Sequence, residues 1–464
     1  MSSTYSFDRP DSNARIPPLL LVLLLNAIAV SVAAASGFLI YVPLVLLGLT
    51  AAILLSRRLA AWLALVILGH LVLFFQRTTQ ISISEAIFGI VFVAYLALYL
   101  VDRIAVKRVP LLTAAGDNAL VVFFAVAFLS VIPAVMFESD LGLWGRELIV
   151  LAGLGLYFPL RESMKTKEGK RVVLFSFALL AVVVAARSIL QYRERLDVIQ
   201  FAWELVSGRQ TANEPLFMAM VVGAGAVLGV SKSAWKQVFS AAVFLLFTLL
   251  LLVTFSRAYW VGTFVGLLIV FLLLQRLERT RFVATLCVVL LGGIGISWLI
   301  LGDRFGAVAD IVVRRLLSAG YVLKDVSFLT RVEESRVVAE HGLRNPILGY
   351  GLGAEFGYYN ALKDVTYVNA YIHNAYLWLW FKLGAAGLLS FLVAYAGKIR
   401  SGFRTITITN NEDRPFVIAA VALLCTMLII SVTSPQFYAR DSVLVIALCW
   451  AILTGSGETV SKDP

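Results

Sequence analysis

The sequence predicts an all-α membrane protein, a polytopic bundle of about 12–14 transmembrane helices with one large outer loop that contains amphipathic helices. Two observations predict this class. Hydrophobic residues make up 60% of the 464 residues and charged residues 14%, whereas a soluble domain has about 45–50% apolar and about 25% charged residues. Apolar runs of about 18 residues or more also recur along the chain without strand-like alternation, which indicates helices rather than a barrel.

The expected spans follow one another with polar segments between them. Two pairs of neighbouring runs are short or barely separated, so the number of transmembrane helices could also be nearer 12. The apolar runs are residues 18–35, 38–55, 59–75, 85–101, 117–136, 146–160, 172–189, 215–231, 237–255, 258–274, 282–301, 374–397, 415–433 and 441–455.

The loops between these runs alternate in charge. One set is rich in Lys and Arg, and the positive-inside rule places it in the cytoplasm together with both termini. The outer loops carry few basic residues, apart from an insertion near 190–214 and the long loop 302–372, which this rule does not govern. The chain therefore divides into transmembrane helices in 1–301, the large loop 302–372 and further helices in 373–464. We expect any chemistry on the outer face.

Composition excludes several other classes. The net charge of +11 could suggest a nucleic-acid partner, but the charges are scattered between apolar runs, where they report membrane topology. Cys287, Cys425 and Cys449 all lie inside apolar runs, without the spacing of a zinc site or a disulfide framework. We expect no nucleic acid, no metal and no cofactor.

The large loop has its own pattern. Thr330–Pro346 predicts an amphipathic helix whose apolar stripe would be Val332, Val337, Val338 and Leu343. The following segment, residues 347–357, is rich in glycine, which allows turns and close backbone approach, but it lacks the lysine of a phosphate-binding loop. The loop acids are expected to be mostly solvated charges on helix faces. They are Asp303, Asp310, Asp325, Glu333, Glu334 and Glu340.

His373 is the strongest candidate for chemistry. It opens an apolar helix where the large loop re-enters the membrane, and an imidazole there can accept a proton from a hydroxyl group near neutral pH. On a continuous helix Gly384 and Gly387 would lie about 20° and 40° from His373, so that one face has a base above small residues. A histidine that only anchors the helix at the interface is the alternative. His70 and His341 are more readily explained as structural residues.

Arg257 is the second candidate. It interrupts apolar sequence between about 237 and 274, which as one helix would be about 57 Å long, against a membrane core of about 30 Å. The chain is therefore expected to turn back at Ser256 and Arg257, which holds the arginine at the outer membrane boundary. An arginine there is costly unless it meets an anion, and its guanidinium fork suits phosphate oxygens.

Arg146 and Arg209 are predicted to lie on the same side. Each could instead be paired with a nearby acid, Arg146 with Glu147, and Arg209 with Glu204 or Glu214. Taken together, three arginines and a histidine on one outer face favour an anionic, lipid-linked substrate.

These residues resemble the pattern of the O-antigen ligase family, which also includes O-oligosaccharyltransferases and repeat-unit polymerases. The signature is His373-Asn374, then nine residues, then residues 384–387 (GAAG). Arg331 followed by residues 345–353 (NPILGYGLG) is similar to the family's glycine-rich loop segment. The Ser256-Arg257 pair and the Arg209 stretch resemble its two arginine-bearing regions, whereas Arg146 matches by position alone.

The resemblance implies a glycosyltransferase of the bacterial inner membrane that faces the periplasm and needs neither metal nor nucleotide. Such an enzyme moves a preassembled glycan from undecaprenyl diphosphate to a sugar hydroxyl of lipid A–core in lipopolysaccharide synthesis. His373 would be the general base of an inverting transfer. Arg257, Arg209 and Arg146 would bind the diphosphate, and Asn374 and Arg331 would support them.

Other functions remain open. A polymerase of repeat units or a protein O-oligosaccharyltransferase would carry the same motifs, because these do not read the acceptor. A transporter of lipid-linked sugars predicts polar groups near the midplane and often repeated halves. Here the candidate groups cluster at one face and the middles of the spans read as apolar, which favours an enzyme.

Overall fold

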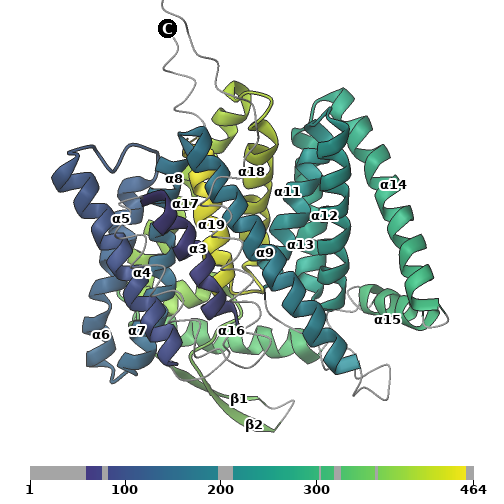
Figure 1. The fold of residues 1–464 in the computed structure, drawn as a ribbon. Coiled ribbons are helices and arrows are strands. Elements are labelled where there is room, and N and C mark those ends of the chain that lie inside the picture. Colours follow the sequence, from purple (N-terminus) through teal and green to yellow (C-terminus); the bar gives the residue numbers. More distant parts are fainter. Residues whose placement is uncertain are drawn as a thin grey trace, which may run out of the picture.

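The computed structural model describes residues 59–75, 82–196, 213–302, 305–317, 326–360 and 364–455. In these residues the chain forms a bundle of helices that run side by side, with smaller elements across one end (Figure 1). The expected spans 18–35 and 38–55 and the residue Arg209 lie outside the described residues.

Each expected span in the described part corresponds to one helix or to a short series of helices. The helices of the bundle are α3 (Leu59–Phe75), α4 (Ile83–Val101), α5 (Asp117–Leu129), α6 (Val131–Met136), α7 (Leu141–Ala152), α8 (Tyr157–Met164), α9 (Lys167–Leu196), α11 (Glu214–Val230), α12 (Ala234–Val253), α13 (Arg257–Leu273), α14 (Arg276–Leu301), α17 (Ala375–Ile408), α18 (Arg414–Ile430) and α19 (Arg440–Gly455). A π-helical turn, Asp102–Val106, extends α4, and a 3-10 turn, Gly153–Leu156, joins α7 to α8.

The helices have the lengths and surfaces of membrane spans. Within the described residues, seven helices are long and apolar enough to cross a bilayer, and four shorter helices are similarly apolar. Large apolar side chains face outwards, such as Val288, Leu291 and Leu299 on α14, which are 69%, 69% and 74% exposed. A soluble protein would not leave such a surface in water, whereas lipid tails cover it at little cost. The fold is therefore an all-α polytopic membrane bundle.

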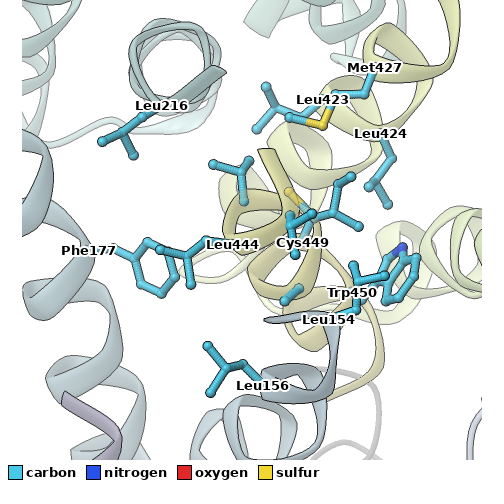
Figure 2. Close-up of a cluster of buried hydrophobic side chains, with 14 of the residues drawn as sticks. Leu154, Leu156, Phe177, Leu216, Leu423, Leu424, Met427, Leu444, Cys449 and Trp450 are labelled. Atoms are coloured by element: carbon cyan, nitrogen blue, oxygen red, sulfur yellow. The ribbon is translucent and has the colours of Figure 1, made fainter. Parts of the chain in front are cut away.

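The core is centred on α19. Trp450, Cys449 and Leu444 of this helix meet Phe177 of α9 and Met427 of α18 (Figure 2). Trp450 is fully buried, as is most of α19. Because α19 touches α8, α17 and α18, the C-terminal helix holds the two halves of the chain together.

The segment between α14 and α17 gathers at one end of the bundle. It consists of α15 (Phe305–Leu317), α16 (Val326–Arg344) and two strands, β1 (Phe356–Asn360) and β2 (Val365–Asn369), which form an antiparallel hairpin. We call this end the hairpin end (Figure 1). The expectation of amphipathic helices is confirmed for this segment, but the hairpin was not expected, although its Tyr-, Val- and Thr-rich strands have residues typical of sheets.

The glycine-rich segment before the hairpin enters a break in α17. Gly384 has φ 63° and ψ −170°, so the helix is interrupted there, and a Cβ on Gly384 would lie 2.0 Å from the carbonyl oxygen of Ile347. Gly349, with φ 68°, packs against the same break, and the Ala385 N–H donates to the Pro346 carbonyl at 2.8 Å. The expected continuous face of His373, Gly384 and Gly387 is therefore wrong, because α17 starts after His373 and breaks at Gly384.

Charged groups are also buried far from the hairpin end. Lys398 of α17 binds Asp117, at the start of α5, and the Tyr157 hydroxyl at 2.7 Å. Arg161 of α8 contacts the same carboxylate at 2.8 Å. The interpretation that polar groups gather on one face alone is thus incomplete. This network is fully hydrogen-bonded and joins three helices, as a buried charge cluster requires for stability.

Candidate active site

His373 lies between β2 and α17 and is held by a buried carboxylate. Its backbone N–H donates to Glu334 Oε1 at 2.7 Å, and its ring Nδ1 is 2.9 Å from Glu334 Oε2. The Glu334 side chain is 2% exposed and the His373 side chain 32% exposed. Because an ionised carboxylate can only accept hydrogen bonds, this contact assigns the ring proton of neutral His373 to Nδ1. It leaves Nε2 with a lone pair, the state that a general base needs.

Glu334 belongs to the buried face of α16. That face is formed by Glu334, Val338 and Gly342, spaced by four residues, with Gly342 under the ring of Trp380. The expected stripe is wrong in part, because Val332 and Leu343 are 50% and 67% exposed. The expectation that Glu334 is solvated is also wrong. This face of α16 packs against a polar site and therefore buries the Glu334 carboxylate. A prediction that sorts residues only into apolar and polar cannot detect such a position.

Asn374 fixes the start of α17 beside His373. Its side-chain oxygen accepts hydrogen bonds from the backbone N–H groups of Tyr376 and Leu377, at 3.0 and 3.1 Å. This is an N-cap, which satisfies donors that the first turn of a helix leaves open. The Ala375 N–H donates to the Ser431 carbonyl at 2.9 Å. His373 therefore sits on a backbone that is fixed on both sides.

The segment between α18 and α19, residues 431–439, connects the site residues of different helices. Tyr438 stacks on Trp378 with ring centroids 4.0 Å apart, and its hydroxyl donates to the Ile372 carbonyl. Burial raises the pKa of this hydroxyl well above its usual range, so that it stays a donor. Tyr371 places its ring edge-on to His373 at 4.9 Å. These contacts form an aromatic wall next to the imidazole.

Arg331 lies one turn before Glu334 on α16. Its guanidinium Nη1 donates to the Thr433 carbonyl at 3.2 Å, in the segment 431–439. Residues three apart share a helix face, so Arg331 and Glu334 both face this segment. The structure thus places Arg331 at the same end of the bundle as His373.

Arg257 is the first residue of α13, and the chain turns sharply just before it. The prediction of this turn is confirmed, since α12 ends at Val253 and Phe255 has a left-handed φ of 51°. Two residues on, the Tyr259 hydroxyl accepts a hydrogen bond from Gln436 at 2.8 Å. Gln436 belongs to the segment 431–439, so the arginine turn and the histidine meet the same segment from two sides.

Arg146 and a residue missed by the sequence analysis, Arg440, share one carboxylate. Glu85, at the start of α4, lies 3.6 Å from Arg146 and 2.9 Å from Arg440. The suggested pairing of Arg146 with Glu147 is wrong, because Glu147 binds Lys382 at 3.0 Å and the Gly353 N–H at 2.7 Å. Arg440 lies in the outer loop before the last span, so the reasoning applied to Arg146 could have found it.

The structure therefore brings His373, Glu334 and Arg331 to one end of the bundle. Arg257 lies two residues before Tyr259, which contacts the same segment 431–439. Arg146 lies beside Arg440, because both pair with Glu85. Arg440 follows Tyr438 by two residues and so borders the aromatic wall. In the described part of the chain, no group of three or more His, Cys, Asp or Glu residues could hold a metal ion.

Comparison with known proteins identifies a family match in the part of the chain that contains His373. Residues 241–392 match the family model of the O-antigen ligases. This match makes one stretch of the chain similar to the O-antigen ligases. No curated protein matches the sequence. The matched stretch extends from α12 to the first half of α17 and so contains His373, Glu334, Arg331 and Arg257, whereas Arg146 and Arg440 are contributed by helices on either side of it.

Proposed function

We propose that this protein is an O-antigen ligase family member, a periplasm-facing transferase of the inner membrane. It moves a preassembled glycan from undecaprenyl diphosphate to a sugar hydroxyl of lipid A–core. The observation that carries the proposal is the His373–Glu334 contact inside the region of the family match, at the end of the bundle that also holds Arg331. A partly exposed imidazole with a buried carboxylate behind it is suited to accept a proton from a bound hydroxyl.

In the proposed step the acceptor oxygen attacks the anomeric carbon of the donor sugar. Its proton passes to His373 Nε2, and the bond from the anomeric carbon to the diphosphate oxygen breaks with inversion. Glu334 keeps the Nδ1 proton in place and stabilises the imidazolium that forms. Because donor and acceptor are both lipids, binding them at one membrane surface also reduces the entropy cost of their encounter.

The leaving diphosphate gains negative charge as the bond breaks. In this proposal Arg257 stabilises that charge with support from Arg331, since preformed donors act most strongly where charge develops. Arg146, which shares Glu85 with Arg440, is proposed to bind the diphosphate as well. Arg209 keeps the diphosphate-binding role that the family pattern implies.

The deciding experiment is a transfer assay with the purified full-length protein in liposomes. It supplies undecaprenyl-diphosphate-linked oligosaccharide and lipid A–core, with a chelator in one arm, and detects the products by mass spectrometry. We expect lipid A–core extended by one glycan, at the same rate with and without the chelator. If neither lipid is changed under any condition, the proposal is wrong.

The same assay separates the related functions. A donor glycan that grows by repeat units would identify a polymerase, and a modified protein acceptor would identify an O-oligosaccharyltransferase. Movement of the donor across the liposome membrane without bond cleavage would identify a transporter. The ligase is preferred to the transporter because His373, Glu334 and Arg331 lie at one end of the bundle and not near its middle.

Glu334→Gln is expected to lower kcat by roughly 100-fold and to leave KM nearly unchanged. Glutamine can still accept from the backbone N–H of His373, but it has no charge to stabilise the imidazolium. The matched control is Glu340→Gln on the same helix, which removes a carboxylate that is 54% exposed and pairs with Arg336. Equal rates for the two variants would remove Glu334 from the mechanism.

A further inference from the structure

A groove of about 760 Å³ lies along the second half of α17, between Leu392 and Thr407. Its floor is an apolar stripe of Leu392, Ala396, Ile399 and Phe403, and Leu428 of α18 lines it as well. These α17 residues follow at intervals of four, three and four, so they form one helix face. Phe403 is 47% exposed, which leaves the stripe open to the surrounding membrane.

Two arginines mark one end of the groove. Arg400 and Arg404 both line it, are both exposed, and lie one turn apart on α17. Across the described ranges, neither guanidinium has a carboxylate within ion-pair distance. Lys398, next to them in sequence, turns the other way and is buried against Asp117. The groove thus combines a long apolar wall with a fork of two positive charges.

The depth of the groove fits one leaflet of a bilayer. α17 starts beside His373, and the part after the break at Gly384 continues for 20 residues, or about 30 Å, to Arg404. The arginines therefore lie at headgroup level on the side opposite the active site. From Leu392 to Arg404 is about 18 Å, close to the length of one acyl layer.

We infer that this groove is a binding site for an anionic phospholipid of the leaflet opposite the active site. The headgroup phosphate would lie between Arg400 and Arg404, and an acyl chain would cover the stripe from Phe403 to Leu392. Charge complementarity favours this occupant. The headgroup of a zwitterionic lipid also carries a positive ammonium group, which the two arginines would repel. The inference does not depend on the transfer reaction, since none of these residues belongs to the active site.

The test compares lipid binding to the full-length protein in detergent by native mass spectrometry. The probes are dioleoyl phosphatidylglycerol and dioleoyl phosphatidylcholine, which have the same acyl chains. We expect one phosphatidylglycerol to bind about 30-fold more tightly, since each basic residue near a membrane surface contributes about 1 kcal/mol towards anionic lipid. The double variant R400Q/R404Q should lose this preference.

A matched control removes two other arginines from the same end of the bundle. Arg171 and Arg276 are exposed and flank the Lys170–Asp413 and Arg414–Glu278 ion pairs. R171Q/R276Q changes the net charge equally and should keep the 30-fold preference. If it loses the preference as well, the binding is unspecific and the inference is wrong.

A second pair of variants tests the apolar wall. Ala396→Trp fills the groove and should abolish the tight binding of phosphatidylglycerol. The control Ala284→Trp, on the exposed face of α14, should leave that binding unchanged. Thermal unfolding of both variants checks that they fold. Unchanged lipid binding by Ala396→Trp would overturn the inference. Displacement of phosphatidylglycerol by equimolar undecaprenyl phosphate would also overturn it, because the groove would then hold the polyprenyl chain.

Discussion

His373→Ala is expected to lower kcat for glycan transfer by about 10²–10⁴-fold, the usual contribution of a general base. The acceptor hydroxyl then has no positioned group to take its proton as it attacks. Both lipids should still bind, because the substitution removes none of the arginines proposed to bind the diphosphate, so that KM changes little. Initial rates at several concentrations of each lipid measure this separation of kcat from KM.

His341→Ala is the control for this variant. His341 lies in the same loop on α16, and its Nδ1 is bonded to the Val337 carbonyl at 2.9 Å within its own helix. We expect nearly wild-type transfer. If His373→Ala retains full activity while folded, His373 is an interfacial anchor, and the general base must be sought elsewhere at the hairpin end.

Arg257→Ala is expected to reduce kcat by about 10²–10³-fold, as the loss of one preformed donor to a developing anion does. Arg257→Lys should recover only part of the rate, because an ammonium group keeps the charge without the two-pronged geometry that suits phosphate oxygens. Single-turnover rates with saturating donor isolate the bond-breaking step from binding.

Arg276→Ala provides a close control. Arg276 opens α14 as Arg257 opens α13, but it lies at the other end of the bundle because a single helix separates the two residues. Its removal should leave transfer unchanged. A comparable loss of transfer activity in both variants would mean that arginines at helix starts support folding or membrane insertion. It would contradict the proposed binding of the diphosphate by Arg257.

The glycine-rich loop, residues 347–357, packs into the break of α17 at Gly384. Gly384 and Gly349 approach each other so closely that a Cβ on either would overlap backbone atoms. The glycines that the sequence marked as turn formers thus allow a loop to enter a membrane helix. The N–H groups freed at the break donate to loop carbonyls, and the freed carbonyls of Phe381 and Lys382 accept from the loop N–H groups of Tyr350 and Gly351. Such pairing is what permits a broken helix inside a bilayer.

The sequence predicts His373 and Arg257 as site residues, but it does not predict Glu334, the carboxylate that holds His373. The sequence indicates His373 because it opens an apolar run where the large loop re-enters the membrane, and Arg257 because it interrupts an apolar stretch too long for one span. Glu334 was taken for a solvated charge, because nothing in the neighbouring residues distinguishes it from Glu333 and Glu340. Its partner is 39 residues further along the chain, and only the packing of α16 across the end of the bundle brings the two together. Arg440 was missed although its position was visible.

The sequence by itself determined the membrane class, the course of the spans in the described part, the turn before Arg257 and the family pattern. These depend on the length and composition of contiguous residues, because a bilayer of fixed thickness acts on each apolar run separately. The tertiary structure alone decided which charges are buried, where α17 breaks, and which carboxylate supports His373. These depend on contacts between distant segments, whose desolvation and hydrogen bonding are set by packing and not by local pattern.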